Sequence, residues 1–172
     1  LGSFNPIEHG FVWATTANPT TANFKTTDGA VSATGTFTSS ITGLIPGTLY
    51  HVRAYATSAA GTSYGEDLTF TALIVPTVTT QAVTSIGTTN AIGNGNITAL
   101  GVPNPTQHGV VWSTSTNPTL ADSKTTDGDI SITGTFTSSI TGLTPGMQYH
   151  VRAYASNVAG TSYGEDVSFT TL

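Results

Sequence analysis

The stretch that decides the fold is GLTPGMQYHVRAYAS at residues 142–156, which occurs earlier in nearly the same form as GLIPGTLYHVRAYAT at residues 43–57. Its first part, Gly-Leu-x-Pro-Gly, is turn chemistry, because proline restricts φ and glycine adopts conformations that other residues resist. From Tyr149 onward, apolar residues alternate with largely polar ones. That alternation is the period of a β-strand with one buried and one hydrated face. We therefore predict a turn followed by a central strand of an antiparallel sheet, present twice in the chain.

A tyrosine follows each of these turns at a fixed spacing. In a tyrosine corner, the phenol at this spacing bonds back to the backbone of the loop that precedes its strand, and such corners occur in β-sandwiches. The two sets with this spacing are Leu44, Pro46, Tyr50, Leu143, Pro145 and Tyr149. We expect both tyrosines to have this structural role.

The second stretch, together with residues 160–169, resembles the end of a fibronectin type III domain. The resemblance rests on Leu143, Pro145, Gly146, Tyr149, Arg152, Ala153, Gly160, Tyr163, Gly164 and their equivalents in the first copy. The whole chain resembles tandem fibronectin type III-like repeats of bacterial surface and secreted proteins. This resemblance implies an all-β fold of immunoglobulin-like antiparallel β-sandwiches, with no helix.

Two features depart from that family. The buried tryptophan that animal members usually carry on their second strand is absent from residues 90–100, and Trp112 lies on the third predicted strand instead. The sequence also contains no Arg-Gly-Asp tripeptide. Integrin-type adhesion is therefore not implied by the resemblance.

Composition narrows the classes of function. Only 8% of the 172 residues are charged and the net charge is −5, so there is no basic surface for nucleic acid or anionic lipid. With no cysteine, the chain has neither disulfides nor thiolate metal sites. No apolar run approaches the roughly 20 residues that a membrane helix needs. A polar, weakly charged β-protein of this kind suits an extracellular or cell-surface location.

The chain contains an internal repeat. Shifting it by 99 positions aligns residues 1–73 with residues 100–172 without a gap, and about two-thirds of the pairs are identical, which indicates a recent duplication. We divide the chain into a repeat at 1–73 and a complete repeat at 74–172. Residues 74–99 supply the first two strands of the second repeat and have no counterpart in the first. The first repeat is therefore predicted to expose a core face and unpaired strand edges.

Two explanations remain open for the two strands that the first repeat lacks. Either the chain is a window on a continuous array, or a neighbouring chain provides the missing strands by β-augmentation, as in donor-strand polymers. The expected partners are accordingly neighbouring repeats of the same chain or other copies that share strands. A glycan is a further candidate partner, whereas nucleic acid and membrane insertion are not expected.

Hydrophobic alternation predicts the remaining strands, and no segment has a useful helical period. The predicted strands cover residues 9–15, 35–41, 64–72, 75–83 and 90–100, with a loop at residues 59–63 and a Thr-rich excursion at residues 20–30. In the closing strand of the first repeat, Leu68 and Phe70 are expected to point inward.

Aromatic and cationic side chains near the central strands are candidates for a binding surface. Because the third and sixth strands are predicted neighbours, the tryptophan of each repeat should lie across from the histidine or arginine of the central strand. The candidate residues are Trp13, Arg53, Tyr55, Trp112, Arg152 and Tyr154. If exposed, they would stack on sugar rings or on another protein. The alternatives are a cation–π ladder that shields the sheet, or tryptophans that point into the core.

Histidines and carboxylates do not favour a metal site. His9 and His51 are predicted at opposite ends of neighbouring strands, too far apart to share zinc. Oxygen ligands for calcium are available in Asp122, Asp127, Asp129, Glu165 and Asp166. However, the first repeat has Asn23 and Ala30 at the positions of Asp122 and Asp129. No nucleophile elbow, paired acid or phosphate-binding loop indicates an enzyme, and no cofactor is expected.

The sequence thus predicts a non-catalytic structural repeat of an extracellular bacterial stalk, adhesin or self-associating fibre. The alternative is an accessory module that binds carbohydrate or protein through the exposed Trp, Arg and Tyr patch.

Overall fold

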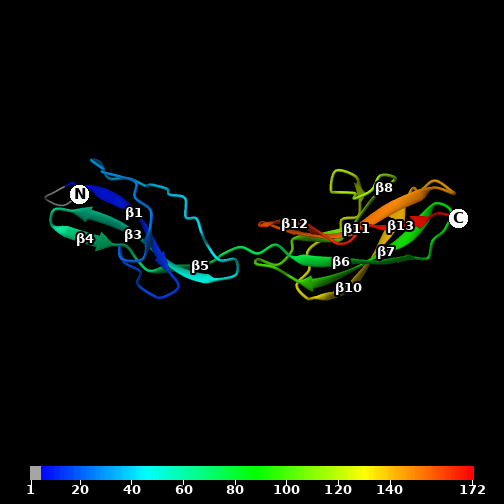
Figure 1. The fold of residues 1–172 in the computed structure, drawn as a ribbon, viewed down its shortest axis with the longest axis horizontal. Coiled ribbons are helices and arrows are strands. Elements are labelled where there is room, and N and C mark those ends of the chain that lie inside the picture. Colours follow the sequence, from blue (N-terminus) through cyan, green and yellow to red (C-terminus); the bar gives the residue numbers. More distant parts are fainter. Residues whose placement is uncertain (1–4) are drawn as a thin grey trace. The chain divides into compact units, whose positions relative to one another are not determined.

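The computed structural model describes residues 5–172, and every regular element in that range is a β-strand. The chain divides into two compact units, Leu1–Ala72 and Leu73–Leu172, which we call unit 1 and unit 2 (Figure 1). The prediction of an all-β, antiparallel fold without helix is confirmed for the described residues. In that part of the chain, no helix has the length and apolarity to span a membrane.

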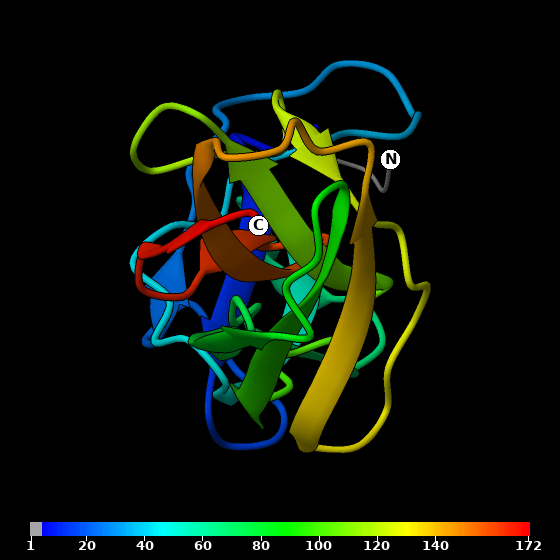
Figure 2. The ribbon, with the colours of Figure 1, turned by 90° about the vertical axis from the view of Figure 1, so that its right-hand side faces the viewer.

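Unit 2 is a sandwich of two antiparallel sheets. Its strands are β6 (Thr77–Thr84), β7 (Asn90–Ala99), β8 (Gln107–Ser113), β9 (Ser123–Lys124), β10 (Gly134–Thr141), β11 (Gln148–Asn157), β12 (Gly160–Tyr163) and β13 (Val167–Thr170). One sheet has the order β10-β7-β6, and the other has the order β12-β11-β8-β9, with β13 also paired to β11. In Figure 2 the gold strand β10 runs along one side of the unit, next to the dark green strands of its own sheet.

Small residues in β7 let the two sheets approach closely. The strand buries alternate residues, among them Gly93 and Gly95. A Cβ atom added to Gly95 would lie 2.8 Å from the Cβ atom of Ala153 in the opposite sheet, which is closer than real Cβ contacts allow. The glycines of this strand are therefore required by packing between the sheets.

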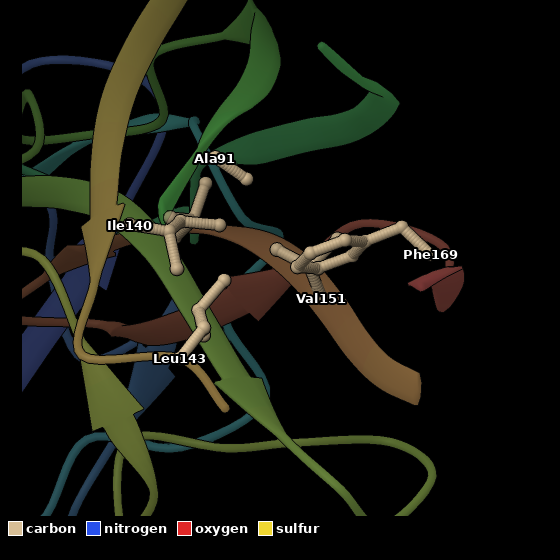
Figure 3. Close-up of a cluster of buried hydrophobic side chains, with 6 residues drawn as sticks. Ala91, Ile140, Leu143, Val151 and Phe169 are labelled. Carbon is tan, nitrogen blue, oxygen red and sulfur yellow. The ribbon is translucent and has the colours of Figure 1, made fainter. Parts of the chain in front are cut away.

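The core of unit 2 forms where the two sheets face each other. Figure 3 shows side chains from both sheets that point toward one another. The buried members of this cluster are Ala91, Val110, Ile140, Leu143, Val151 and Phe169. Burial of each larger aliphatic or aromatic side chain contributes about 1.5–3 kcal/mol to folding, so this cluster and a second one, formed by Val78, Ile97, Ala153 and Ala155, stabilise the unit.

Unit 1 has one sheet in its described part. Its strands are β1 (Glu8–Ala14), β2 (Phe24–Lys25), β3 (Leu49–Ser58), β4 (Gly61–Tyr64) and β5 (Leu68–Thr71). They have the order β2-β1-β3-β4, with β5 also paired to β3. This sheet repeats the β9-β8-β11-β12 sheet of unit 2. Among residues 5–72, no strand corresponds to β6, β7 or β10.

Two sequence-based strand predictions need correction in unit 1. The predicted closing strand at residues 64–72 is interrupted, because β4 ends at Tyr64 and β5 begins at Leu68. Part of β4 lies in residues 59–63, where we predicted only a loop. Leu68 is 60% exposed, although it pairs with Val52 on the inward-facing side of the sheet. Its exposure arises because no second sheet covers that side among residues 5–72.

The predicted strand at residues 35–41 is not a strand in the structure. Residues 35–42 read GTFTSSIT, which is identical to β10, yet they have no regular structure and are drawn as a light-blue coil in Figure 1. In unit 2, β10 is a strand because it pairs with β7 along its whole length. A strand needs a partner for its backbone N–H and C=O groups, and the described part of unit 1 supplies none at this edge.

Candidate functional site

Strand register assigns the side chains of each unit to two faces. In unit 1, Trp13 pairs with Val52, whereas Val12 pairs with Arg53. Directly paired residues of antiparallel strands point to the same side of the sheet. We call the side that carries Trp13 the inner face and the side that carries Arg53 the outer face.

The tryptophans belong to the inner face. Trp13 is 7% exposed and packs with Tyr50 and Ala72. In unit 2, Trp112 pairs with Val151 and is half-buried against the core. Both indole rings therefore point away from the side of the sheet that carries the arginines.

The tyrosines of the candidate patch are covered. Tyr55 is 2% exposed and Tyr154 is 1% exposed. The hydroxyl of Tyr55 donates to the carbonyl oxygen of Thr26 at 2.8 Å, and the hydroxyl of Tyr154 donates to that of Thr125 at 2.7 Å. Burial raises the pKa of both phenols. The Thr-rich excursion thus lies over this part of the outer face.

The predicted patch is therefore not one surface. Its tryptophans lie on the inner face, its arginines lie on the outer face, and its tyrosines lie under a loop; the residues concerned are Trp13, Arg53, Tyr55, Trp112, Arg152 and Tyr154. The physical reason is strand parity. Each tryptophan pairs with the valine next to the arginine, and successive residues of a strand point to opposite sides.

Each arginine contacts a tyrosine that was not included in the predicted binding patch. The guanidinium of Arg53 lies 4.7 Å from the ring centroid of Tyr64, and its Nε donates to the carbonyl oxygen of Gly65 at 2.9 Å. Arg152 has the same 4.7 Å contact with Tyr163 in unit 2. Repetition of the tyrosine in both copies of GTSYGED was the available signal in the sequence.

The same tyrosines anchor the excursion to the sheet. The hydroxyl oxygen of Tyr64 accepts a hydrogen bond from the backbone amide of Thr21 at 3.0 Å, and that of Tyr163 accepts one from the amide of Leu120 at 3.0 Å. This hydrogen bonding, mainly from Thr21, lowers the pKa of Tyr64. The loop thus bonds to the hydroxyl of Tyr64, and the arginine lies over its ring.

An aspartate makes a second anchor beside it. The carboxylate of Asp67 accepts a hydrogen bond from the backbone amide of Asn18 at 2.8 Å and lies 2.9 Å from Nδ1 of His51. These contacts, led by the Asn18 amide, lower the pKa of Asp67. Asp166 accepts the equivalent hydrogen bond from Asn117 at 2.8 Å.

Two of the carboxylates considered for calcium, Asp122 and Asp127, accept hydrogen bonds from nearby groups of their own unit. Asp122 accepts from the backbone amide of Thr119 at 2.8 Å, and Asp127 accepts from the hydroxyl of Ser138. Nδ1 of His9 donates to the carbonyl oxygen of Gly29 at 2.7 Å. Within residues 5–172, no three His, Asp or Glu side chains are grouped so as to hold a metal ion.

Each tyrosine of the corner motif bonds to the loop before its strand. The hydroxyl oxygen of Tyr50 accepts from the backbone amide of Ile45 at 3.1 Å, and that of Tyr149 accepts from the amide of Thr144 at 3.0 Å. Each ring also stacks on a phenylalanine of the neighbouring strand, Phe70 or Phe169. The leucines differ between the units, since Leu143 is buried and Leu44 is half-exposed.

The inner face of unit 1 is the surface that distinguishes the two units. Val52, Ala54 and Ala56 are half-exposed there, whereas the three equivalent residues of β11 are buried. The residues of β11 concerned are Val151, Ala153 and Ala155. An apolar sheet face that is covered in one repeat is thus partly open in the other.

Two clefts lie on this face. One has a volume of about 400 Å³ and includes His9, Phe37 and Ala56, and the other has a volume of about 290 Å³ and includes Ala54 and Gly65. In unit 2 the corresponding positions are covered by the second sheet. The hydroxyl of Thr80 in β6, for instance, accepts a hydrogen bond from the backbone amide of Ala153 at 2.9 Å.

No protein-family model matches the sequence, and no curated protein matches it. A crystal structure of the FN1–FN3 domains of chicken CNTN1 aligns with 95% of this chain and 56% of that one, with a TM-score of 0.47 and 15% identity. The chain thus spans little more than half the length of that structure. The strand order of unit 2, in which β10-β7-β6 faces β12-β11-β8-β9 with β13 also paired to β11, is the finding that decides the architecture. Unit 2 is a fibronectin type III-like sandwich.

Proposed function

We propose that this chain is a non-catalytic structural repeat module of an extracellular bacterial stalk, adhesin or self-associating fibre. The observation that carries the proposal is the set of contacts made by side chains that occur in both repeats. Several that are polar or aromatic in both copies form contacts within their own unit, among them Arg53, Tyr64 and Asp67 and their equivalents. They brace the central strand, the tyrosine corner and the excursion over the outer face.

The arginine of the central strand illustrates this use. Arg53 and Arg152 occupy equivalent positions, and each has its guanidinium over a tyrosine and its Nε on a backbone carbonyl. These contacts hold the backbone at Gly65 and Gly164 against the central strand, which is the role expected of such groups in a mechanical module. The duplication therefore preserves an architecture in which these groups are engaged.

The chain connection between the units is short, which fits serial repetition. Only residues 72–76 separate β5 from β6, and Pro76 among them is buried. A junction of this length, with a proline, restricts the freedom of a linker. Repeats joined in this way convert folded domains into length.

The alternative function, a carbohydrate- or protein-binding accessory module, would need exposed tryptophans beside the arginines. Burial of Trp13 and the separation of Trp112 from Arg152 by strand parity favour the structural role. The weakly charged, threonine-rich composition supports an extracellular or cell-surface location.

Concatemers of the complete repeat test the proposal. Arrays of one to four copies of residues 73–172 would be measured by small-angle X-ray scattering. We expect the maximum dimension to grow by about 30 Å per copy, the length of a ten-residue strand at about 3.3 Å per residue. Equal unfolding temperatures for all arrays, or higher ones for the longer arrays, are expected as well. Arrays that collapse to a compact particle of constant length would rule out a stalk or fibre role.

A further inference from the structure

Each unit has a cleft at the same place, beside the short strand β2 or β9. In unit 2 the cleft has a volume of about 620 Å³ and includes Trp112, Ser123 and Tyr149. In unit 1 it has a volume of about 570 Å³ and includes Phe24 and Tyr50, the equivalents of the last two. Both volumes lie in the range of roughly 300–1,000 Å³ that is typical of small-molecule sites. The duplicated fold therefore provides this cleft twice.

In unit 1 an aromatic ring covers the tryptophan beside the cleft. Phe24 pairs with Trp13 across β1 and β2, and the two rings stack with their centroids 5.9 Å apart and an interplanar angle of 20°. Trp13 is only 7% exposed, although unit 1 has a single sheet in its described part. A flat, apolar ring thus fits the face of this indole.

In unit 2 no ring stands at the corresponding position. Ser123 pairs with Trp112 across β8 and β9, and Trp112 is half-buried, so its indole is more exposed than that of Trp13. Tyr149 is likewise half-buried, whereas Tyr50 is 4% exposed. Two aromatic rings that are covered in unit 1 are therefore accessible in the cleft of unit 2.

The rim of the cleft is also more polar in unit 2. Three lining residues of unit 1, Ala14, Asn23 and Phe24, are replaced in unit 2 by Ser113, Asp122 and Ser123. The carboxylate of Asp122 accepts a hydrogen bond at Oδ2 from the backbone amide of Thr119 at 2.8 Å. Its Oδ1 accepts no hydrogen bond from residues 5–172, so that oxygen is free to accept one from a ligand. The two serine hydroxyls can both donate and accept.

We propose that the cleft of unit 2 is a binding site for a neutral pyranose sugar. A pyranose has an apolar face of C–H groups, which lies on the indole of Trp112 in the place that the phenylalanine ring takes in unit 1. Its hydroxyls bond to the carboxylate of Asp122 and to the hydroxyls of Ser113 and Ser123. An apolar wall with a few polar groups that fix orientation is the usual composition of a small-molecule site.

The charges at the cleft favour a neutral sugar over an anionic ligand. No lysine or arginine is among the described residues that line it, and the net charge of the chain is −5. The carboxylate of Asp122 would repel a phosphate, sulfate or uronic acid group. A quaternary ammonium ion would use the indole and the carboxylate but not the hydroxyl donors of the rim, whereas a sugar uses all three.

This site differs from the binding patch predicted from the sequence. Of the patch in unit 2, only Trp112 lines the cleft, and Arg152 lies on the outer face, paired with Val111. The site adds a binding activity to the structural role proposed above and does not rest on it. Growth in the length of the concatemers tests the structural role without any sugar, so the two proposals can fail separately.

Titration of the full 172-residue chain with methyl glycosides tests the proposal. The probes are the methyl glycosides of glucose, galactose, mannose and N-acetylglucosamine, and binding is followed by NMR of the labelled chain. The chain has two tryptophans, so their indole N–H resonances distinguish the two clefts. We expect at least one probe to shift the indole resonance of Trp112 saturably, with a dissociation constant in the millimolar range, and to leave that of Trp13 unchanged.

Residues taken from unit 1 provide matched variants that are compatible with the fold. Ser123→Phe places over Trp112 the ring that unit 1 carries, and it should weaken binding at least about tenfold because that ring takes the place of the sugar. Asp122→Asn should weaken binding by about three- to tenfold, since a charged acceptor makes a stronger hydrogen bond than a neutral one. Phe24→Ser, the matched control in unit 1, should leave binding at Trp112 unchanged.

Four results would overturn the proposal. If no probe shifts the Trp112 resonance at its highest soluble concentration, the cleft is not a site for a neutral pyranose. If the Ser123→Phe chain binds as well as the unaltered chain, the sugar does not lie on the indole. Equal shifts of Trp13 and Trp112 would mean that the sugars contact any indole without a specific site. If tetramethylammonium gives saturable shifts of Trp112 and the glycosides do not, the cleft is a cation site.

Discussion

Gly164 lies directly beneath the backbone of Thr80 in unit 2, so that a Cβ atom on the glycine would overlap the threonine amide and lie 2.8 Å from the carbonyl carbon of Thr79. At Gly65, its equivalent in unit 1, the same atom would lie 3.7–3.8 Å from atoms of Ala54, which is ordinary van der Waals contact. Neither glycine has a positive φ, so the two differ in packing and not in backbone conformation.

Alanine substitution at these two positions should have opposite consequences. Gly164→Ala is expected to destabilise unit 2 by about 1–3 kcal/mol through overpacking. Gly65→Ala is expected to leave unit 1 unchanged or slightly more stable, because alanine restricts the unfolded chain more than glycine does. Urea unfolding followed by NMR, which resolves the two units, measures both. Equal destabilisation of the two units would contradict the packing difference.

The two copies of GTFTSSIT should differ in amide hydrogen exchange. Their intrinsic exchange rates are the same because their sequences are identical. Amides of β10 that bond to β7 are expected to exchange at least about tenfold more slowly than their equivalents at residues 35–42, since unpaired backbone opens at little cost. Exchange at 25 °C and neutral pH, followed residue by residue, gives the comparison. Similar protection in both copies would mean that residues 35–42 already have a partner strand.

Removal of the corner phenol should weaken each unit. Tyr149→Phe deletes the hydrogen bond from the amide of Thr144 and leaves the stacking on Phe169 in place. We expect a loss of about 0.5–1.5 kcal/mol in the stability of unit 2. Tyr50→Phe should do the same in unit 1, because its bond to Ile45 is equivalent. A change in the wrong unit, or none in either, would deny the corner a role in stability.

The stability of unit 1 should depend on pH through Asp67. Its pKa is lowered in the folded state, first by the Asn18 amide and then by His51. The carboxylate therefore contributes stability that is present above its unfolded pKa of about 3.9 and is lost as pH falls through the lower folded value. Asp67→Asn should destabilise unit 1 at pH 5, and the difference from wild type should shrink below about pH 4. A difference that stays constant from pH 5 to pH 2 would show that charge is not involved.

A buried asparagine should stabilise unit 2 alone. The side-chain amide of Asn157 donates to the carbonyl oxygens of Ile74 at 2.8 Å and Pro103 at 2.7 Å, and unit 1 has Ser58 at this position. Asn157→Ser removes this donor from both carbonyls, of which that of Ile74 keeps the hydrogen bond from the amide of Val102, and a loss of about 0.5–1.5 kcal/mol is expected. Ser58→Asn is the matched control and should leave the stability of unit 1 within about 0.5 kcal/mol. Thermal unfolding of both variants makes the comparison.

Strand parity limited what could be predicted about the candidate patch. The alternation in β11 was readable because it is a local property of ten consecutive residues. Which residue of β8 faces Arg152 depends on register between strands about 40 residues apart in sequence. That register places Val111 and not Trp112 opposite the arginine. A shift of one residue moves a side chain to the other face of the sheet, so the patch could not be secured from sequence.

The sequence by itself determined the elements that rest on local chemistry: the Gly-Pro turns, the alternating strands, the spacing of each tyrosine corner and the duplication that defines two units. Tertiary structure alone decided whether GTFTSSIT becomes a strand, since the same eight residues are β10 beside β7 and irregular at residues 35–42. The physical reason is that strand formation depends on hydrogen bonds and apolar contacts from a distant segment, and only unit 2 has that segment among the described residues.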